Sequence, residues 1–350
     1  MADVLRPDAR RAIAIANGTS QHGRHWPIVA LYAGPAIILG LITLIVPLAV
    51  VIGLSFTDYR LGASTLSFIG ARNFVDLASD PVMRHSLANT LAYTALVVPA
   101  STATGLGLAM LIDARTSLKG LYRTIHFLPV MAATIAIAVV WEFMLHPSFG
   151  LVNLLLAKAG IAGPRWLEDP STALISLAII GVWQMAGFNM VLFLTGLTAI
   201  PAQYYEAAAV DGAARAWDRF WLVTWPMLRP VTGFVVVISV IRSFQLFETV
   251  YVITGGGPQK STEVLLYTMF SEAFEFFRTG RAAAIAVVFL LLVGMLTLVK
   301  FRVALHRASG GASPRACSSE AASASAREAV NDLARASTRE VPDYVSGSQS

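Results

Sequence analysis

The sequence predicts an all-α protein that crosses a membrane six times. Apolar residues make up 56% of the 350 residues and charged residues only 13%, whereas a typical soluble domain carries about 25% charged residues. The apolar residues gather in six runs, each close to or longer than the roughly 20 residues that a membrane-spanning helix needs. Polar residues gather between these runs, which is the pattern of a polytopic membrane protein.

The predicted spans form one transmembrane domain over residues 27–302. Their approximate bounds are 28–54, 87–112, 124–145, 171–200, 231–253 and 282–301. Pro35 and Pro47 interrupt the first run, which a membrane helix tolerates when its neighbours satisfy the freed backbone groups.

Small residues recur at a spacing of four in the second predicted span. Gly105 and Ala109 form one such pair, and Ala103 and Gly107 form another. Small side chains at this spacing let helix backbones approach closely, so we expect this helix to pack tightly against a neighbour. A flexible hinge is the alternative reading.

Polar tails flank the predicted domain. Residues 1–26 form a basic lead that is too long for an ordinary signal peptide, and we interpret them as a cytoplasmic tail. Residues 303–350 are rich in Ala, Ser and Arg and contain the single cysteine, Cys317. A segment of this composition buries too little apolar surface to fold, so we expect a disordered cytoplasmic tail.

The distribution of positive charge predicts the orientation. Six spans place both termini on one side of the membrane, and the short link 113–123 on that side carries Arg115, Lys119 and Arg123. Lys and Arg are enriched in cytoplasmic loops, so the termini, this link and the segment 201–230 are expected in the cytoplasm. The arginines form no stripe with interleaved aromatic residues, and a nucleic-acid partner is therefore not expected.

The segment 201–230 is a polar island between two apolar runs. Pro201 suits the first turn of a helix, and a short helix is expected from Tyr204 to Asp211. Gly212 follows, a residue that ends helices in the left-handed conformation. A second short helix is expected over 213–225, stopped by prolines at 226 and 230.

Each of these short helices has a distinct expected surface. On the second helix, Trp217, Phe220, Trp221 and Thr224 share one face, which we expect against the membrane interface or the bases of the spans. The first helix presents Glu206 beside small alanines. A narrow helix of this kind suits a groove on another protein, although a solvated loop with a chance alanine run is an equally simple reading.

The island resembles the coupling motif of bacterial ABC importer permeases. The matching residues are Glu206, Ala207 and Ala208, then Asp211 and Gly212, then Pro226 and Pro230; Trp225 stands where the family usually has Leu. The resemblance covers about residues 28–301. It includes Gly255, Gly256, Gly257 and Pro258, which are typical of permeases for sugars and glycerol phosphate.

The resemblance implies a type I ABC importer permease in the bacterial cytoplasmic (inner) membrane. It implies a second permease subunit, two ATPase subunits that each grip one coupling helix, and an extracytoplasmic solute-binding protein. The solute would be a sugar, a polyol or a glycerol-phosphate compound. ATP would be bound by the partner subunits, so this chain would be neither an enzyme nor the holder of a cofactor.

The resemblance also implies roles for two groups of residues. Glu206 would pair with a cation of the ATPase, Gly212 would keep the turn, and the loop 255–258 would lie near the binding protein. This loop does not match a phosphate-binding loop, because Gln259 stands where that motif needs Gly before Lys260.

Polar residues inside the spans are candidates for the translocation pathway. Arg242 lies well inside the fifth span, where a charge costs roughly 2.5–3.5 kcal/mol on insertion scales. It could contact an oxygen-rich or anionic solute, form a structural ion pair, or extend to the interface. Phe244 and Gln245 would suit a sugar, and Asn189 in the fourth span is a further candidate, although packing is the commoner use of such residues.

Other functional classes have less support in the sequence. A secondary transporter or channel for a small polar solute is the alternative, but internal repeats and intramembrane acidic relays are missing. A membrane-embedded enzyme is not indicated, because the sequence contains no HExxH or GxSxG motif.

Overall fold

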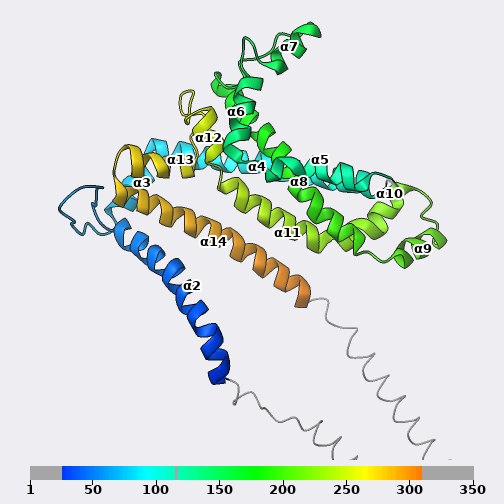
Figure 1. Ribbon diagram of the computed structural model, residues 1–350, viewed down its shortest axis with the longest axis horizontal. Coiled ribbons are helices and arrows are strands. Elements are labelled where there is room, and N and C mark those ends of the chain that lie inside the picture. Colours follow the sequence, from blue (N-terminus) through cyan, green and yellow to red (C-terminus); the bar gives the residue numbers. More distant parts are fainter. Residues whose placement is uncertain (1–25, 115–116, 310–350) are drawn as a thin grey trace, which may run out of the picture. The chain divides into compact units, whose positions relative to one another are not determined.

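A computed structural model describes residues 26–114 and 117–309, and most of these residues are helical. The elements (Figure 1) are α2 (Trp26–Ser55), α3 (Arg72–Ser79), α4 (Pro81–Asp113), α5 (Lys119–Met131), α6 (Thr134–Met144), α7 (Leu151–Lys158), α8 (Pro170–Thr198), α9 (Ala202–Val210), α10 (Ala216–Arg219), the π turn η2 (Phe220–Thr224), α11 (Trp225–Phe244), α12 (Glu248–Ile253), α13 (Leu265–Phe270), the π turn η3 (Ser271–Glu275) and α14 (Thr279–Ser309). Within the described residues the only bridge of β type joins Thr57 and Phe68. The all-α prediction is confirmed.

Among the described residues, five stretches of helix are long and apolar enough to cross a membrane, and the number is six when one bent pair of helices is counted as a span. They lie within 31–55, 81–113, 170–198, 216–253 and 279–298, and the bent pair α5 and α6 passes the same test when counted as one. The polytopic prediction is therefore confirmed. The predicted tail 1–26 lies almost wholly outside the described residues. So do residues 310–350, whereas α14 continues past the predicted domain end at 302.

The third predicted span is not one straight helix. α5 and α6 meet at an angle of 96°, and the two residues between them, Ala132 and Ala133, have extended backbones. Pro129 lies in the last turn of α5, where it removes a backbone donor and crowds the preceding turn. A break shortly after this proline follows from its chemistry.

The core of the fold is the packing of α4 against α8, with α11 against both. Gly105 is buried at this contact, and a methyl group added to it would lie 2.6 Å from Cβ of Asn189. Ala109, one turn further along α4, is fully buried, whereas Ala103 and Gly107 are exposed. The predicted close approach is confirmed for the pair Gly105 and Ala109, and only for that pair.

The prediction that Pro226 and Pro230 stop a helix is wrong. α10, η2 and α11 follow one another without a gap, and Pro230 lies inside α11. In η2 the Trp225 N–H bonds to the Phe220 carbonyl, which is π geometry. The carbonyl that Pro226 would crowd in an α-helix, that of residue 222, lies in this wider turn.

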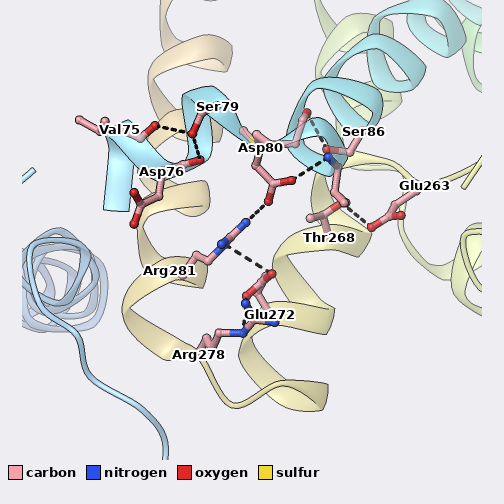
Figure 2. A network of polar contacts seen from close by, with 12 residues as sticks. Val75, Asp76, Ser79, Asp80, Ser86, Glu263, Thr268, Glu272, Arg278 and Arg281 are labelled. Atoms are coloured by element: carbon pink, nitrogen blue, oxygen red, sulfur yellow. Dashed lines mark hydrogen bonds and ion pairs between the residues drawn. The ribbon is translucent and has the colours of Figure 1, made fainter. Parts of the chain in front are cut away.

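A network of charged residues joins three elements (Figure 2). The Asp80 carboxylate accepts a hydrogen bond from the Val82 N–H at the start of α4, at 2.8 Å, and it pairs with Arg281 of α14. Arg281 Nε lies 3.5 Å from Glu272 of η3, and Arg278 Nε lies 3.3 Å from the same carboxylate. Thus α4, η3 and the start of α14 are tied together.

The chain divides into two units, Met1–Val293 and Gly294–Ser350. The described part of the second unit is the last part of α14, 294–309, in which Met295 and Leu298 are exposed. The candidate site residues all belong to the first unit.

Candidate functional site

α9 begins and ends as its flanking residues dictate. Pro201 is the N-cap residue with an extended backbone (ψ 137°) rather than part of the first turn as predicted, and the helix begins at Ala202 rather than at Tyr204. Gly212 has φ +93°, a conformation that side chains disfavour, and the helix ends just before it. The predicted left-handed turn at Gly212 is confirmed.

The exposed surface of α9 and of the turn after it carries two acids, Glu206 and Asp211, beside the small residues Ala207 and Gly212. Glu206, Ala207, Asp211 and Gly212 are exposed, and within the described residues the Glu206 side chain has no hydrogen bond or ion pair. Ala208 differs from the prediction, because it is only 8% exposed. It lies three residues after Tyr205, on the face of the helix that turns toward the protein.

The inner face of α9 is attached to η2. The Tyr205 hydroxyl lies 3.1 Å from the Thr224 hydroxyl. Ala208 packs with Ala213 and Val223 in a small buried cluster. The two short helical segments of the island are therefore held together, and α9 is not a free loop.

The aromatic residues of the island form a continuous cluster. Trp217, Phe220, Trp221 and Trp225 contact one another with ring centroids 5.2–6.2 Å apart, and Trp217 and Trp221 are exposed. Thr224 is buried instead of sharing this face. A π turn contains more residues than an α-helical turn, so the residue that reaches the aromatic face one turn later is Trp225 and not Thr224.

Arg242 of α11 is exposed and stacks on an aromatic ring of α8. Its guanidinium carbon lies 4.0 Å from the centroid of the Phe188 ring, a cation–π contact. Within the described part of the chain Arg242 forms no ion pair. Gln245, at the end of α11, is also exposed.

Two of the candidate pathway residues are buried. Phe244 is 2% exposed and Asn189 is 0% exposed. The Asn189 amide donates to the Ser101 hydroxyl at 3.3 Å and accepts from the Ser239 hydroxyl at 3.2 Å, so it joins α4, α8 and α11. Neither side chain has a surface with which to touch a solute in this conformation.

The glycine-rich loop is fixed in place by residues on both sides. Gly255 and Gly256 have positive φ angles of 55° and 81°, and a side chain at Gly256 would meet the Tyr267 ring at 2.8 Å. The Thr262 hydroxyl donates to the Gly257 carbonyl at 2.6 Å. Asn89 of α4 donates to the carbonyls at 260 and 263, at 3.0 and 2.9 Å.

Three contacts described above were not predicted from the sequence: those of Phe188 with Arg242, of Tyr205 with Thr224, and of Asn89 with the loop after Gly257. Phe188 carries no signal beyond being aromatic in a span, and Tyr205 and Thr224 are 19 residues apart with no shared period. Asn89 offered a weak signal, because it is a polar residue at the start of an apolar run. In the described residues no three His, Cys, Asp or Glu side chains gather as metal ligands would.

Comparisons with known proteins agree with this architecture. Residues 101–308 match the family of binding-protein-dependent transport system inner membrane components. The lactose transport system permease protein LacF of Rhizobium radiobacter is 35% identical over 79% of this chain and 94% of its own length. The sn-glycerol-3-phosphate transport system permease protein UgpA of Agrobacterium fabrum is 33% identical over 70% of this chain and 83% of its own.

A solved structure has the same fold. A chain in the crystal structure of a bacterial alginate ABC transporter, in complex with an alginate pentasaccharide-bound periplasmic protein, aligns with a TM-score of 0.69 and 25% identity. The alignment covers 79% of this chain and 93% of that one. The likeness therefore extends over nearly the whole of the solved chain.

Proposed function

This chain belongs to the family of binding-protein-dependent transport system inner membrane components, and on that premise we propose that α9 is the docking point for an ATP-binding subunit. The chain is the membrane-embedded translocation subunit of an ABC importer. Such a subunit needs a cytoplasmic surface that receives the motion of an ATPase. We assign that surface to Glu206, Ala207, Asp211 and Gly212.

The observation that carries this assignment is the shape and charge of α9. Its inner face is packed against η2 through Ala208, so it is held in place. The assigned surface has two acids, Glu206 and Asp211, whose side chains are free of partners within the described residues, beside the small residues Ala207 and Gly212. Such a helix can enter a groove on another protein, where its acidic side chain would pair with a basic residue.

The proposed assembly has this chain beside a second permease subunit, above two ATP-binding subunits. A solute-binding protein would approach the opposite side, where the loop 255–258 offers a fixed surface. Both termini and α9 would be cytoplasmic, as the basic link 113–123 indicates. ATP hydrolysis would belong to the partners.

The proposed solute is a sugar, a polyol or a glycerol-phosphate compound. The names of the relatives, which include lactose and glycerol-3-phosphate permeases, support this class. The exposed Arg242 guanidinium beside the Phe188 ring suits a solute rich in oxygen or bearing a negative charge. Gln245 adds an exposed amide near the same end of α11.

Copurification with the ATP-binding subunits tests the proposal. Glu206→Lys reverses the exposed charge of α9, and it should reduce the amount of ATP-binding subunit that copurifies. Glu142→Lys makes the same change on α6, where the glutamate is also exposed, and it should leave copurification unchanged. Equal recovery of the ATP-binding subunit with both variants would contradict the docking assignment.

Uptake into vesicles tests the transport class itself. Vesicles that contain this chain with its partner subunits should accumulate the solute only when ATP and the loaded binding protein are present. Uptake that continues without ATP, driven by an ion gradient, would identify a secondary transporter instead.

A further inference from the structure

Two adjacent tyrosines of α9 have different environments. The Tyr205 hydroxyl lies 3.1 Å from Thr224 Oγ1, while Tyr204 is 46% exposed and its hydroxyl has no hydrogen bond in the described residues. The Thr224 hydroxyl also lies 3.5 Å from the Arg219 carbonyl. If Thr224 donates to that carbonyl, it accepts from Tyr205. Tyr205 therefore has a defined partner in η2, and Tyr204 does not.

Packing reinforces the contact of α9 with η2. Ala208, Ala213 and Val223 are each at most 8% exposed and form one cluster. Their short side chains let the backbones approach closely. Nearby, Arg219 Nε donates to the Ala213 carbonyl at 3.1 Å, which fixes the turn after Gly212 to α10.

η2 is continuous with α11 on its other side. The π turn joins the two without a break, and Thr224 is the residue directly before α11. One turn later, Leu228 is fully buried, and its Cδ2 atom would lie 2.9 Å from a Cβ added at Gly196 of α8. A displacement of Thr224 is therefore a displacement of the base of the fifth span.

The covalent path from α9 to α11 is longer than the contact between Tyr205 and Thr224. It leaves the helix at Asp211 and passes through the left-handed Gly212 and a non-helical turn up to Arg215. Close packing transmits displacement, and the contact of Tyr205 with Thr224 is backed by the buried cluster of Ala208, Ala213 and Val223. The contact between Tyr205 and Thr224 bypasses the turn.

We propose that Tyr205 and Thr224 are positioning residues that carry a displacement of α9 into α11. This inference rests on the proposed function, in which α9 moves with the bound ATP-binding subunit. Glu206 then makes the contact with the partner, and its neighbour Tyr205, which contacts η2, passes the motion inward. π turns in helices are frequent at functional sites, which agrees with this placement.

The test measures how strongly the nucleotide state of the ATP-binding subunits changes the accessibility of the end of α11. In the full complex, Gln245→Cys in a Cys317→Ser background supplies one cysteine at the exposed end of α11. Its rate of reaction with a maleimide is compared without nucleotide and with ATP plus vanadate. The ratio of the two rates should be reduced about two- to tenfold by Tyr205→Phe, the size expected when one hydrogen bond is lost.

Control variants separate transmission from folding and from docking. Tyr204→Phe should keep the wild-type ratio, and Thr224→Val should behave like Tyr205→Phe, while Thr224→Ser should restore the ratio. The double variant Tyr205→Phe/Thr224→Val should be no worse than either single variant. Copurification of the ATP-binding subunits and the apparent melting temperature should be unchanged in Tyr205→Phe.

Two results would overturn the inference. One is a ratio in Tyr205→Phe that is no smaller than in the wild type. The other is an equal loss in Tyr204→Phe, which would show that the hydrogen bond is not responsible. Failure of the proposed function looks different, because then Glu206→Lys retains the ATP-binding subunits whatever the Tyr205 variants do.

Discussion

Asp80 and Arg281, which lie 201 residues apart, form an ion pair that joins the start of α4 to the start of α14. Asp80 also caps α4 through the Val82 N–H. One carboxylate therefore performs two tasks, and these can be separated because asparagine keeps an oxygen for the cap but has no charge.

We predict that Asp80→Asn lowers the stability of the protein. The two side chains are 18% and 22% exposed, so the loss should be about 1–3 kcal/mol, between the values typical of exposed and buried pairs. The apparent melting temperature in detergent measures it. Asp76→Asn, an exposed aspartate in α3, serves as the control. An equal melting temperature for wild type and Asp80→Asn would refute the role of the pair.

Glu272 should make the stability depend on pH. Burial raises the pKa of this carboxyl, and the neighbouring Glu263 adds to the effect, although Arg278 and Lys260 oppose it. A carboxyl whose pKa is raised on folding stabilises the protein when protonated, and this stabilisation is lost as pH rises through the folded pKa. The window therefore begins near the ordinary value of 4.5 and extends upward.

The measurement is a comparison of the wild type with Glu272→Gln, which cannot titrate at this position. As pH falls from 7 toward 4.5, the melting temperature of the wild type should rise relative to that of Glu272→Gln. The same comparison with Glu275→Gln, an exposed glutamate one turn away, should show no such trend. A difference between wild type and Glu272→Gln that stays constant with pH would show that Glu272 does not titrate as described.

Gly105→Ala should destabilise the contact between α4 and α8. The added methyl group would lie 2.6 Å from Asn189 Cβ and 3.1 Å from the Met190 nitrogen, and overpacking of this kind costs typically about 1–3 kcal/mol. Gly107→Ala is the matched control, because nothing lies within 4 Å of its added methyl group. The melting temperature of Gly105→Ala should be lower than that of Gly107→Ala. Similar melting temperatures would show that α4 and α8 move apart to admit the methyl group at little cost.

Arg242→Gln should reduce solute uptake about tenfold, as expected when a charged hydrogen-bonding group on the pathway is lost. Arg242→Lys should retain part of the uptake, because it keeps the charge but has no planar group to stack on Phe188. Arg229→Gln, at the other end of α11 and also exposed, should have no effect on uptake into vesicles. Uptake by Arg242→Gln at the wild-type rate would remove Arg242 from the pathway.

The features that were predictable from the sequence depend on local chemistry. The spans follow from length and apolar content, and α9 follows from Pro201 and Gly212, which mark its two ends. The pair Gly105 and Ala109 was recognisable from its spacing. The sequence did not say which of the two small pairs in that helix meets α8, because a neighbouring helix decides it.

The features that were not predictable depend on contacts between distant residues or on small changes of register. Asn189 in an apolar span can line a pathway or satisfy its amide in the core, and its partners Ser101 and Ser239 lie 88 and 50 residues away. The π turn has no marker in the sequence, yet it turns Thr224 inward and lets the helix continue through Pro226. The 96° bend between α5 and α6 follows Pro129, but a proline alone does not predict such a break, because Pro35 and Pro47 lie inside the continuous helix α2.

If α9 receives an ATP-binding subunit, site-specific cross-linking from α9 should capture that subunit. A photo-crosslinking residue is placed at Glu206 in the full complex, and in a separate variant at Gln259, an exposed residue of the glycine-rich loop. We expect an adduct with the ATP-binding subunit from position 206 and none from position 259. An ATP-binding subunit captured from position 259, or no such adduct from position 206, would contradict the docking assignment.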